Sequence, residues 1–143
     1  MAINNVPDGF EPHYRKSPFT DPWEPLYSQI LPDRVRIGVV LAEAHCNSRG
    51  MVHGGFIASM ADNSMGLSCG EVMKAEGRAA DGLVTINLTT DFMGAAKLGQ
   101  WLDVDTHYVK IGGSVCFTDC FIRADGDPIA RASATFKILK ARR

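Results

Sequence analysis

The sequence has no long apolar run and no excess of charge of either sign. Nowhere do its 143 residues contain about 20 consecutive apolar residues, the length that a membrane-spanning helix needs. Fifteen lysines and arginines oppose sixteen aspartates and glutamates, which leaves a formal net charge of -1. Without a basic field, the chain has no general attraction for nucleic acid or for an anionic membrane surface. We therefore expect neither partner.

Signals for secretion, disulfides and metal binding are also missing. The first ten residues lack the basic start and apolar stretch of a secretory signal, so we expect a cytoplasmic protein. The sequence has neither a CxxC pair nor a dense cysteine framework, and we expect free thiols. The four cysteines stand at positions 46, 69, 116 and 120. A metal site of His45, Cys46 and His53 would lack a fourth ligand at a suitable spacing, and we expect no metal.

The composition, with 45% hydrophobic and 22% charged residues, is that of one folded domain. β-branched residues predict a first strand over 34–44, and a nearly all-round apolar pattern predicts a helix from Gly54 to about Lys74. Hairpin signals separate the last three of four further predicted strands. These strands lie near 83–93, 101–111, 114–124 and 128–139. The order predicts an α+β fold in which one antiparallel sheet curls around one long central helix.

The segment before residue 34 has a different composition. Six of the seven prolines lie in residues 7–32, interleaved with five aromatic residues. This pattern predicts an extended or short-helical arm, and its aromatic content indicates that it packs on the body of the protein. We therefore divide the chain into an N-terminal arm, 1–33, and a domain, 34–143. One interpretation of the arm is that it covers a substrate.

Asp62 is the only formally charged residue between Arg49 and Glu71. A carboxylate on an apolar helix is costly to bury unless partners satisfy it. One interpretation is a structural hydrogen bond, for instance to Asn63 or to a hydroxyl on a facing strand. The other is a catalytic or binding role, because desolvated carboxylates also serve as reactive bases.

His53-Gly54-Gly55 stands immediately before the predicted helix. Free backbone amides at a helix N-terminus can hold an anion or a developing oxyanion, and glycine lets a ligand approach them. The alternative is a loop-to-helix junction that His53 caps. In the preceding loop, Asn47 offers an amide side chain, although asparagine in turns commonly bonds its own backbone.

Together these residues resemble a known family. Asn47, Gly50, the run Val52-His53-Gly54-Gly55 and the run Ala61-Asp62-Asn63 resemble the hotdog-fold acyl-CoA thioesterases of the phenylacetate-degradation (PaaI-like) group. The resemblance extends over about residues 34–139, including the stretch 85–90 and the turn 96–99. It implies a hotdog fold, in which a curved antiparallel sheet wraps a central helix.

The resemblance also implies roles for single residues. Asp62 matches the carboxylate that acts as nucleophile or general base, and Gly54 matches the residue whose backbone amide polarises the thioester carbonyl. Asn47 matches the side chain that positions the attacking water or substrate, and His53 the histidine beside the oxyanion site. Thr85 falls where relatives carry a hydroxyl near the reacting centre. No cofactor is expected, because CoA enters as part of the acyl-CoA substrate.

We also expect a homodimer with sites shared between the chains. Gly54 and Asp62 are eight residues apart, so their backbones lie about 12 Å apart along the helix axis. A carbonyl held at one helix N-terminus must then meet Asp62 of another copy. The family resemblance implies the same dimer, and a further pairing of dimers into tetramers.

Two other functions remain open at this point. A hydratase or dehydratase of acyl thioesters would use His53 and Asp62 for proton transfer, and a non-catalytic module would only bind acyl-CoA. Thiol release from a panel of acyl-CoAs separates both from a thioesterase.

The acyl group is also open. Phe56, Met60 and Met65 fit either an apolar pocket or the core. The basic candidates for the CoA phosphates are Lys97, Lys137, Lys140 and Arg142.

Overall fold

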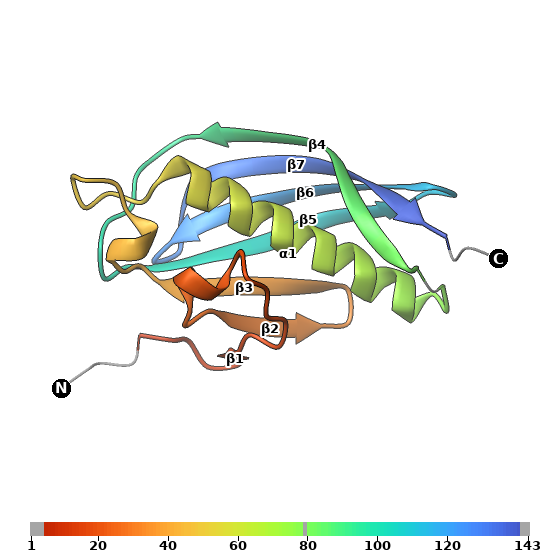
Figure 1. Ribbon diagram of the computed structural model, residues 1–143, viewed down its shortest axis with the longest axis horizontal. Coiled ribbons are helices and arrows are strands. Elements are labelled where there is room, and N and C mark those ends of the chain that lie inside the picture. Colours follow the sequence, from red (N-terminus) through yellow and green to blue (C-terminus); the bar gives the residue numbers. More distant parts are fainter. Residues whose placement is uncertain (1–4, 79, 141–143) are drawn as a thin grey trace.

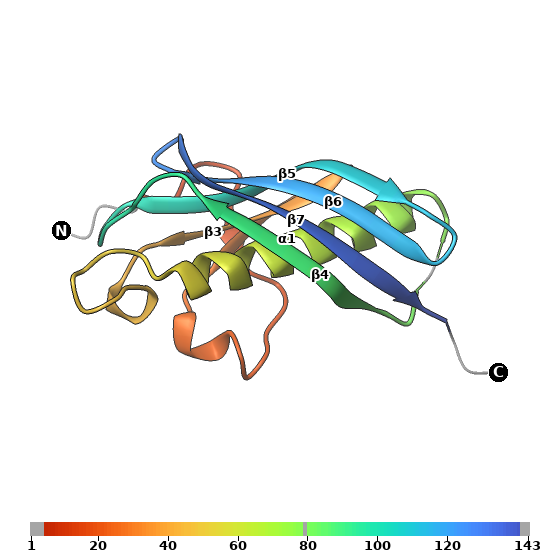
Figure 2. The same cartoon turned by 90° about the horizontal axis from the view of Figure 1, so that it is seen from above.

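A computed structural model describes residues 5–78 and 80–140. Within these residues one long helix, α1 (Gly54–Ala75), lies along one face of a seven-stranded antiparallel sheet that curves around it (Figures 1 and 2). The strand order is β1-β2-β3-β5-β6-β7-β4. The strands are β1 (Glu11–Pro12), β2 (Tyr27–Leu31), β3 (Arg34–Val40), β4 (Gly82–Phe92), β5 (Trp101–Ile111), β6 (Val115–Ala124) and β7 (Asp127–Leu139). The predicted α+β fold is confirmed.

The helix packs on a sheet face made of small residues. Along β7, Ala130, Ala132 and Ala134 are buried, while Arg131 and Ser133 between them are exposed. This alternation follows from the two-residue period of a strand and leaves space for a helix backbone. No helix among the described residues is long and apolar enough to cross a membrane.

The cysteines are free, as predicted, and three of them belong to the core. Cys69 on α1 and Cys116 and Cys120 on β6 are fully buried. Burial raises the pKa of Cys120 to about 12, which disfavours the reactive thiolate. These thiols pack as small apolar groups.

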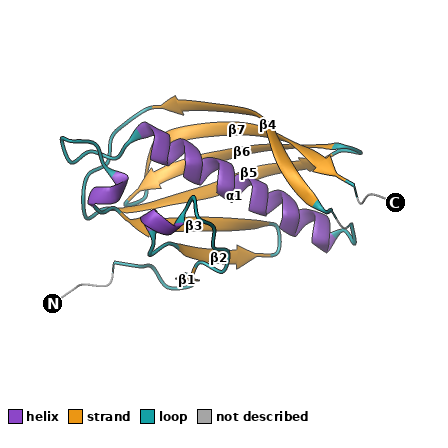
Figure 3. Ribbon diagram, in the orientation of Figure 1, coloured by secondary structure: helices purple, strands orange, loops and turns teal. Residues whose placement is uncertain are grey.

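Two details differ from the prediction. The first long strand ends at Val40 instead of Ala44, and Glu43–His45 form a short 3-10 helix, η2, visible beside the long helix in Figure 3. The arm supplies β2, which pairs with β3 from Tyr27 opposite Gly38 to Leu31 opposite Arg34. Five residues between two prolines give too short a pattern to predict this strand.

His45 fixes the arm to the start of α1. Its Nδ1 accepts a hydrogen bond from the Ala42 backbone N–H at 2.9 Å, and its Nε2 donates to the Trp23 carbonyl at 2.8 Å. Trp23 is the last residue of another short 3-10 helix, η1 (Asp21–Trp23). Its ring contacts Phe56 of α1 edge-on. The arm is therefore a packed part of the structure.

We predict that acid destabilises the protein through its buried histidines. Burial lowers the pKa of His45 below its ordinary 6.5, and that of His13 in the same direction. Below pH 6.5 the unfolded chain then binds more protons than the folded one. The free energy of unfolding therefore decreases as the pH is lowered. His45→Gln should lower it by about 1–3 kcal/mol at pH 8 and flatten its decline on acidification. Denaturant unfolding, measured from pH 8 to below pH 6.5, checks both effects. If the free energy of unfolding of His45→Gln declined with acidification as steeply as that of the wild type, the assignment to His45 would be wrong.

Candidate active site

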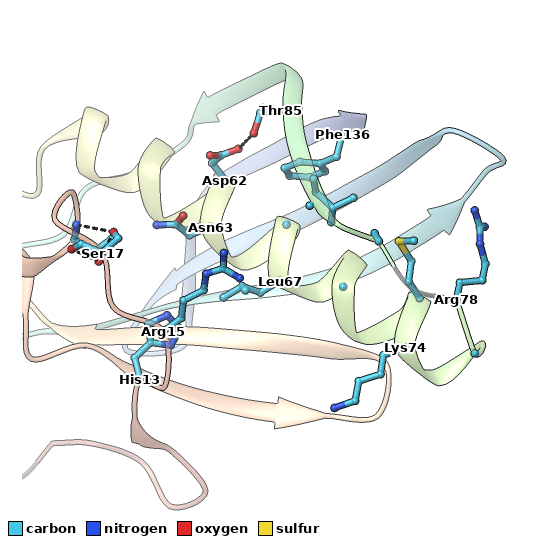
Figure 4. Close-up of a pocket in the computed structure, with 18 residues that line it drawn as sticks. His13, Arg15, Ser17, Asp62, Asn63, Leu67, Lys74, Arg78, Thr85 and Phe136 are labelled. Atoms are coloured by element: carbon cyan, nitrogen blue, oxygen red, sulfur yellow. Dashed lines mark hydrogen bonds between the residues drawn. The ribbon is translucent and has the colours of Figure 1, made fainter. Parts of the chain in front are cut away.

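A groove of about 730 Å³ lies against the outer face of α1. Its walls are the first half of β4, with Leu83 and Thr85, and residues 13–20 of the arm. Figure 4 shows Asp62 and Thr85 at one part of this groove and Phe136 and Leu67 further along it. Thus the groove leads from the corner with Asp62 and Thr85 to a stretch that includes apolar side chains.

Asp62 is only partly buried, although the apolar helix pattern suggested a more buried carboxylate. The reason is that small groups follow it on the same side of α1: Gly66 is one turn further and Gly70 two turns further, and both line the groove. The Thr85 hydroxyl donates a hydrogen bond to Asp62 Oδ1 at 2.6 Å. This is the strand hydroxyl that the structural interpretation anticipated, and it leaves the second carboxylate oxygen free to react.

Thr85 owes its position to an irregularity in β4. Thr85 pairs with Phe136, the next residue pair is Asn87 with Thr135, and Ile86 between them is extra. Such a bulge bends a strand and redirects its side chains. The bulge therefore directly follows the residue that contacts Asp62.

At the N-terminus of α1, one backbone N–H remains free. The His53 ring caps the helix, since its Nδ1 accepts from Gly55 N–H at 2.8 Å. The His53 carbonyl accepts from the N–H groups of Phe56 and Ile57. The N–H of Gly54 bonds to no other described residue. Of the first four helix amides, Gly54 alone is thus available to a ligand at the positive end of the helix dipole.

Asn47 shapes the loop before the helix. Its Oδ1 accepts from the backbone N–H groups of Arg49 and Met51, at 2.9 and 3.2 Å. This is the local backbone bonding expected of asparagine in turns. The Nδ2 group donates to no described residue, so it remains the part of Asn47 that can meet a ligand.

The five predicted site residues therefore form two groups. Asp62 and Thr85 line the groove together, whereas Asn47, His53 and Gly54 lie at the helix N-terminus and do not line it. Two helical turns separate the groups within one chain, about 12 Å along the axis.

Residues 49–130 match the family model of the thioesterase superfamily. The chain belongs to the thioesterase superfamily. It is 32% identical to a Pseudomonas aeruginosa protein provisionally named an esterase, across 94% of this chain and 98% of that protein. It is 33% identical to human acyl-coenzyme A thioesterase 13, across 73% of this chain and 72% of the human protein.

Solved structures agree on the fold. A mutant form of the phenylacetic acid degradation protein PaaI from Thermus thermophilus superposes with a TM-score of 0.73. The match has 17% identity and covers 86% of this chain and all of the other. The resemblance to hotdog thioesterases of the PaaI-like group is confirmed.

The alternative metal site finds no support in this thioesterase. His45 uses both ring nitrogens on the protein, and His53 Nδ1 is bonded to Gly55. No group of three or more histidine, cysteine or acidic side chains among the described residues could hold a metal ion.

The basic residues of the groove were missed by the sequence analysis. They are Arg15 from the arm, Lys74 on α1 and Arg78 beyond its end. Of the earlier candidates for the CoA phosphates, Lys97, Lys137 and Lys140 do not line the groove, and Arg142 lies outside the described residues. The only signal was the basic pair Arg15-Lys16, whose place depends on how the arm folds back.

The apolar pocket candidates belong to the core instead. Phe56, Met60 and Met65 are at most 4% exposed and none lines the groove. Core packing explains them fully.

Proposed function

We propose that this thioesterase hydrolyses acyl-CoA to a free acid and CoA. The observation that carries the proposal is the pair of groups on α1: a free amide at Gly54 and a carboxylate at Asp62 held by a strand hydroxyl. Hydrolysis of a thioester needs such an oxyanion donor and such a base or nucleophile, and no cofactor. The name of the human relative supports CoA as the thiol.

The chemistry divides between these groups. Gly54 N–H stabilises the negative charge that develops on the carbonyl oxygen. Asp62 either attacks the carbonyl carbon, giving a mixed anhydride that water opens, or takes a proton from an attacking water. In both routes the carbon–sulfur bond breaks and CoA leaves as a thiolate that is then protonated. The hydroxyl of Thr85 orients the carboxylate.

The free amide and the carboxylate must come from different chains, and β4 offers the surface that could pair them. It is an edge strand, bonded only to β7 among the described strands. Four of its large apolar side chains are solvent-exposed in the single chain, including Ile86 at 58% and Phe92 at 55%. Open strand edges with apolar residues favour pairing with another strand. A two-fold dimer through β4 would place the partner subunit's Gly54 opposite Asp62.

The runner-up functions fit the geometry less well. A hydratase needs a histidine free to move protons, but Gly55 N–H occupies His53 Nδ1. A panel of acyl-CoAs assayed for free thiol decides among the functions. We expect thiol release with at least one acyl group. Binding of CoA without thiol release from any of them would show a binding module and contradict the proposal.

Asp62→Asn should reduce turnover by about 100-fold or more, because an amide is a poor base and a poor nucleophile. The amide oxygen can still accept from Thr85, so thermal stability should stay close to wild type. Thiol release and melting temperature check the two parts. Near-normal turnover, with reversion to aspartate excluded by mass spectrometry, would contradict the assignment.

Gly54→Pro should also remove turnover, because proline has no N–H. The first helical position accepts proline, and the extended backbone of His53 (φ -76°, ψ 132°) suits the residue before it. The matched control is Gly54→Ala, which adds a Cβ in the same place near the Phe92 ring but keeps the N–H. We expect the alanine variant to retain most of its turnover. Equal losses in both folded variants would assign the effect to crowding instead.

A further inference from the structure

We propose that Arg15 of the arm and Lys74 of α1 form a subsite that binds an anionic group of the substrate. This inference rests on the proposed hydrolysis and extends it, because it assigns a role in the same groove to a segment outside the matched residues 49–130.

The arm holds the backbone around Arg15 in a defined place. On one side of it, the backbone N–H of His13 donates to the Leu26 carbonyl at 2.9 Å. On the other, the hydroxyls of Ser17 and Thr20 bond at 3.0 Å. His13 and Thr20 are at most 7% exposed, and both line the groove. Residues 13–20 therefore form a fixed wall of the groove.

From this wall the Arg15 side chain extends toward Leu67 and Asn63 on α1 (Figure 4). Lys74 lies further along the same helix and also lines the groove. Neither residue forms an ion pair with the part of the chain that the structure describes. Arg78, by contrast, donates to the carbonyls of Gly112 and Gly113.

The charge of the groove favours an anion. Among the described residues, three cationic side chains line it, and Asp62 is the only acidic one. Burial lowers the pKa of His13, so the imidazole in this wall is neutral near pH 7. Arg15 and Lys74 are both exposed, so their charges are open to a ligand that enters the groove. An anionic group would satisfy them with charge-assisted hydrogen bonds.

The helix sets the distance between this subsite and the reacting atoms. Leu67, toward which the Arg15 side chain extends in Figure 4, is five residues from Asp62, and Lys74 is twelve, which gives about 8 and 18 Å along the axis. The groove floor between Leu67 and Lys74 stays open, since a Cβ on Gly70 would meet no atom within 4 Å. The subsite therefore extends over roughly one to three turns of α1 beyond Asp62. The anion is either a carboxylate at the end of the acyl chain or a phosphate of CoA.

The test compares Arg15→Met with Lys16→Met. Methionine keeps the apolar stem of either side chain and removes its charge. Lys16 is the next residue of the arm, does not line the groove, and pairs with Glu24 at the surface. KM is measured for a neutral acyl-CoA and for one of equal length that ends in a carboxylate, together with inhibition by free CoA.

Arg15→Met should raise KM by about tenfold, with kcat within about twofold of wild type, and Lys16→Met should change neither. A rise for the carboxylate-ended substrate alone assigns the anion to the acyl chain. A rise for both substrates with weaker CoA inhibition assigns it to a CoA phosphate. No larger change in Arg15→Met than in Lys16→Met overturns the subsite.

Failure of the proposed hydrolysis is distinguishable from failure of the subsite. Wild-type protein that releases no thiol from any acyl-CoA contradicts the hydrolysis. The same acyl-CoAs then serve as ligands, and calorimetric Kd values of wild type and the two variants replace KM in the comparison.

Discussion

Eight residues of α-helix separate the free amide of Gly54 from the carboxylate of Asp62, and a rigid helix cannot bring them together. The helix shares one buried core with the alanines of β7 and the thiols of β6. The two groups therefore stay about 12 Å apart along the axis in one chain. A single thioester carbonyl can contact the Gly54 amide and the Asp62 carboxylate only where the α1 helices of two chains lie antiparallel beside each other. The proposed site shared between two chains depends on this separation.

The edge of the sheet suits such a pairing. On the far side, β2 and the very short β1 carry the sheet into the arm, while β4 leaves its outer edge open. The bulge at Ile86 lies in this open strand, next to the residue that bonds Asp62. Thus the same strand that positions the carboxylate also presents the exposed apolar surface. Pairing through β4 would both complete the site and cover the exposed apolar side chains of this strand.

Much of the fold could be predicted from local pattern. The helix from Gly54 and the strand over 101–111 were placed correctly, because periodicity and hairpin glycines are local signals. The contact between Asp62 and Thr85 lay within reach of the family resemblance. The position of Arg15 could not be predicted in this way, because it depends on how the arm packs on the domain through the contacts of His45 and Trp23. The partial exposure of Asp62 was also hidden, since it follows from glycines that only the packed structure shows facing a groove.

The most direct test of the shared site is complementation between two inactive variants. Asp62→Ala and Gly54→Pro are mixed in equal amounts, unfolded and refolded together, with each variant alone as the control. If the amide and carboxylate act across two chains, half of the dimers are mixed and each has one intact site of two. About a quarter of wild-type activity should then return. If both groups act within one chain, every site stays broken, and activity no higher than in the separate variants would contradict the account.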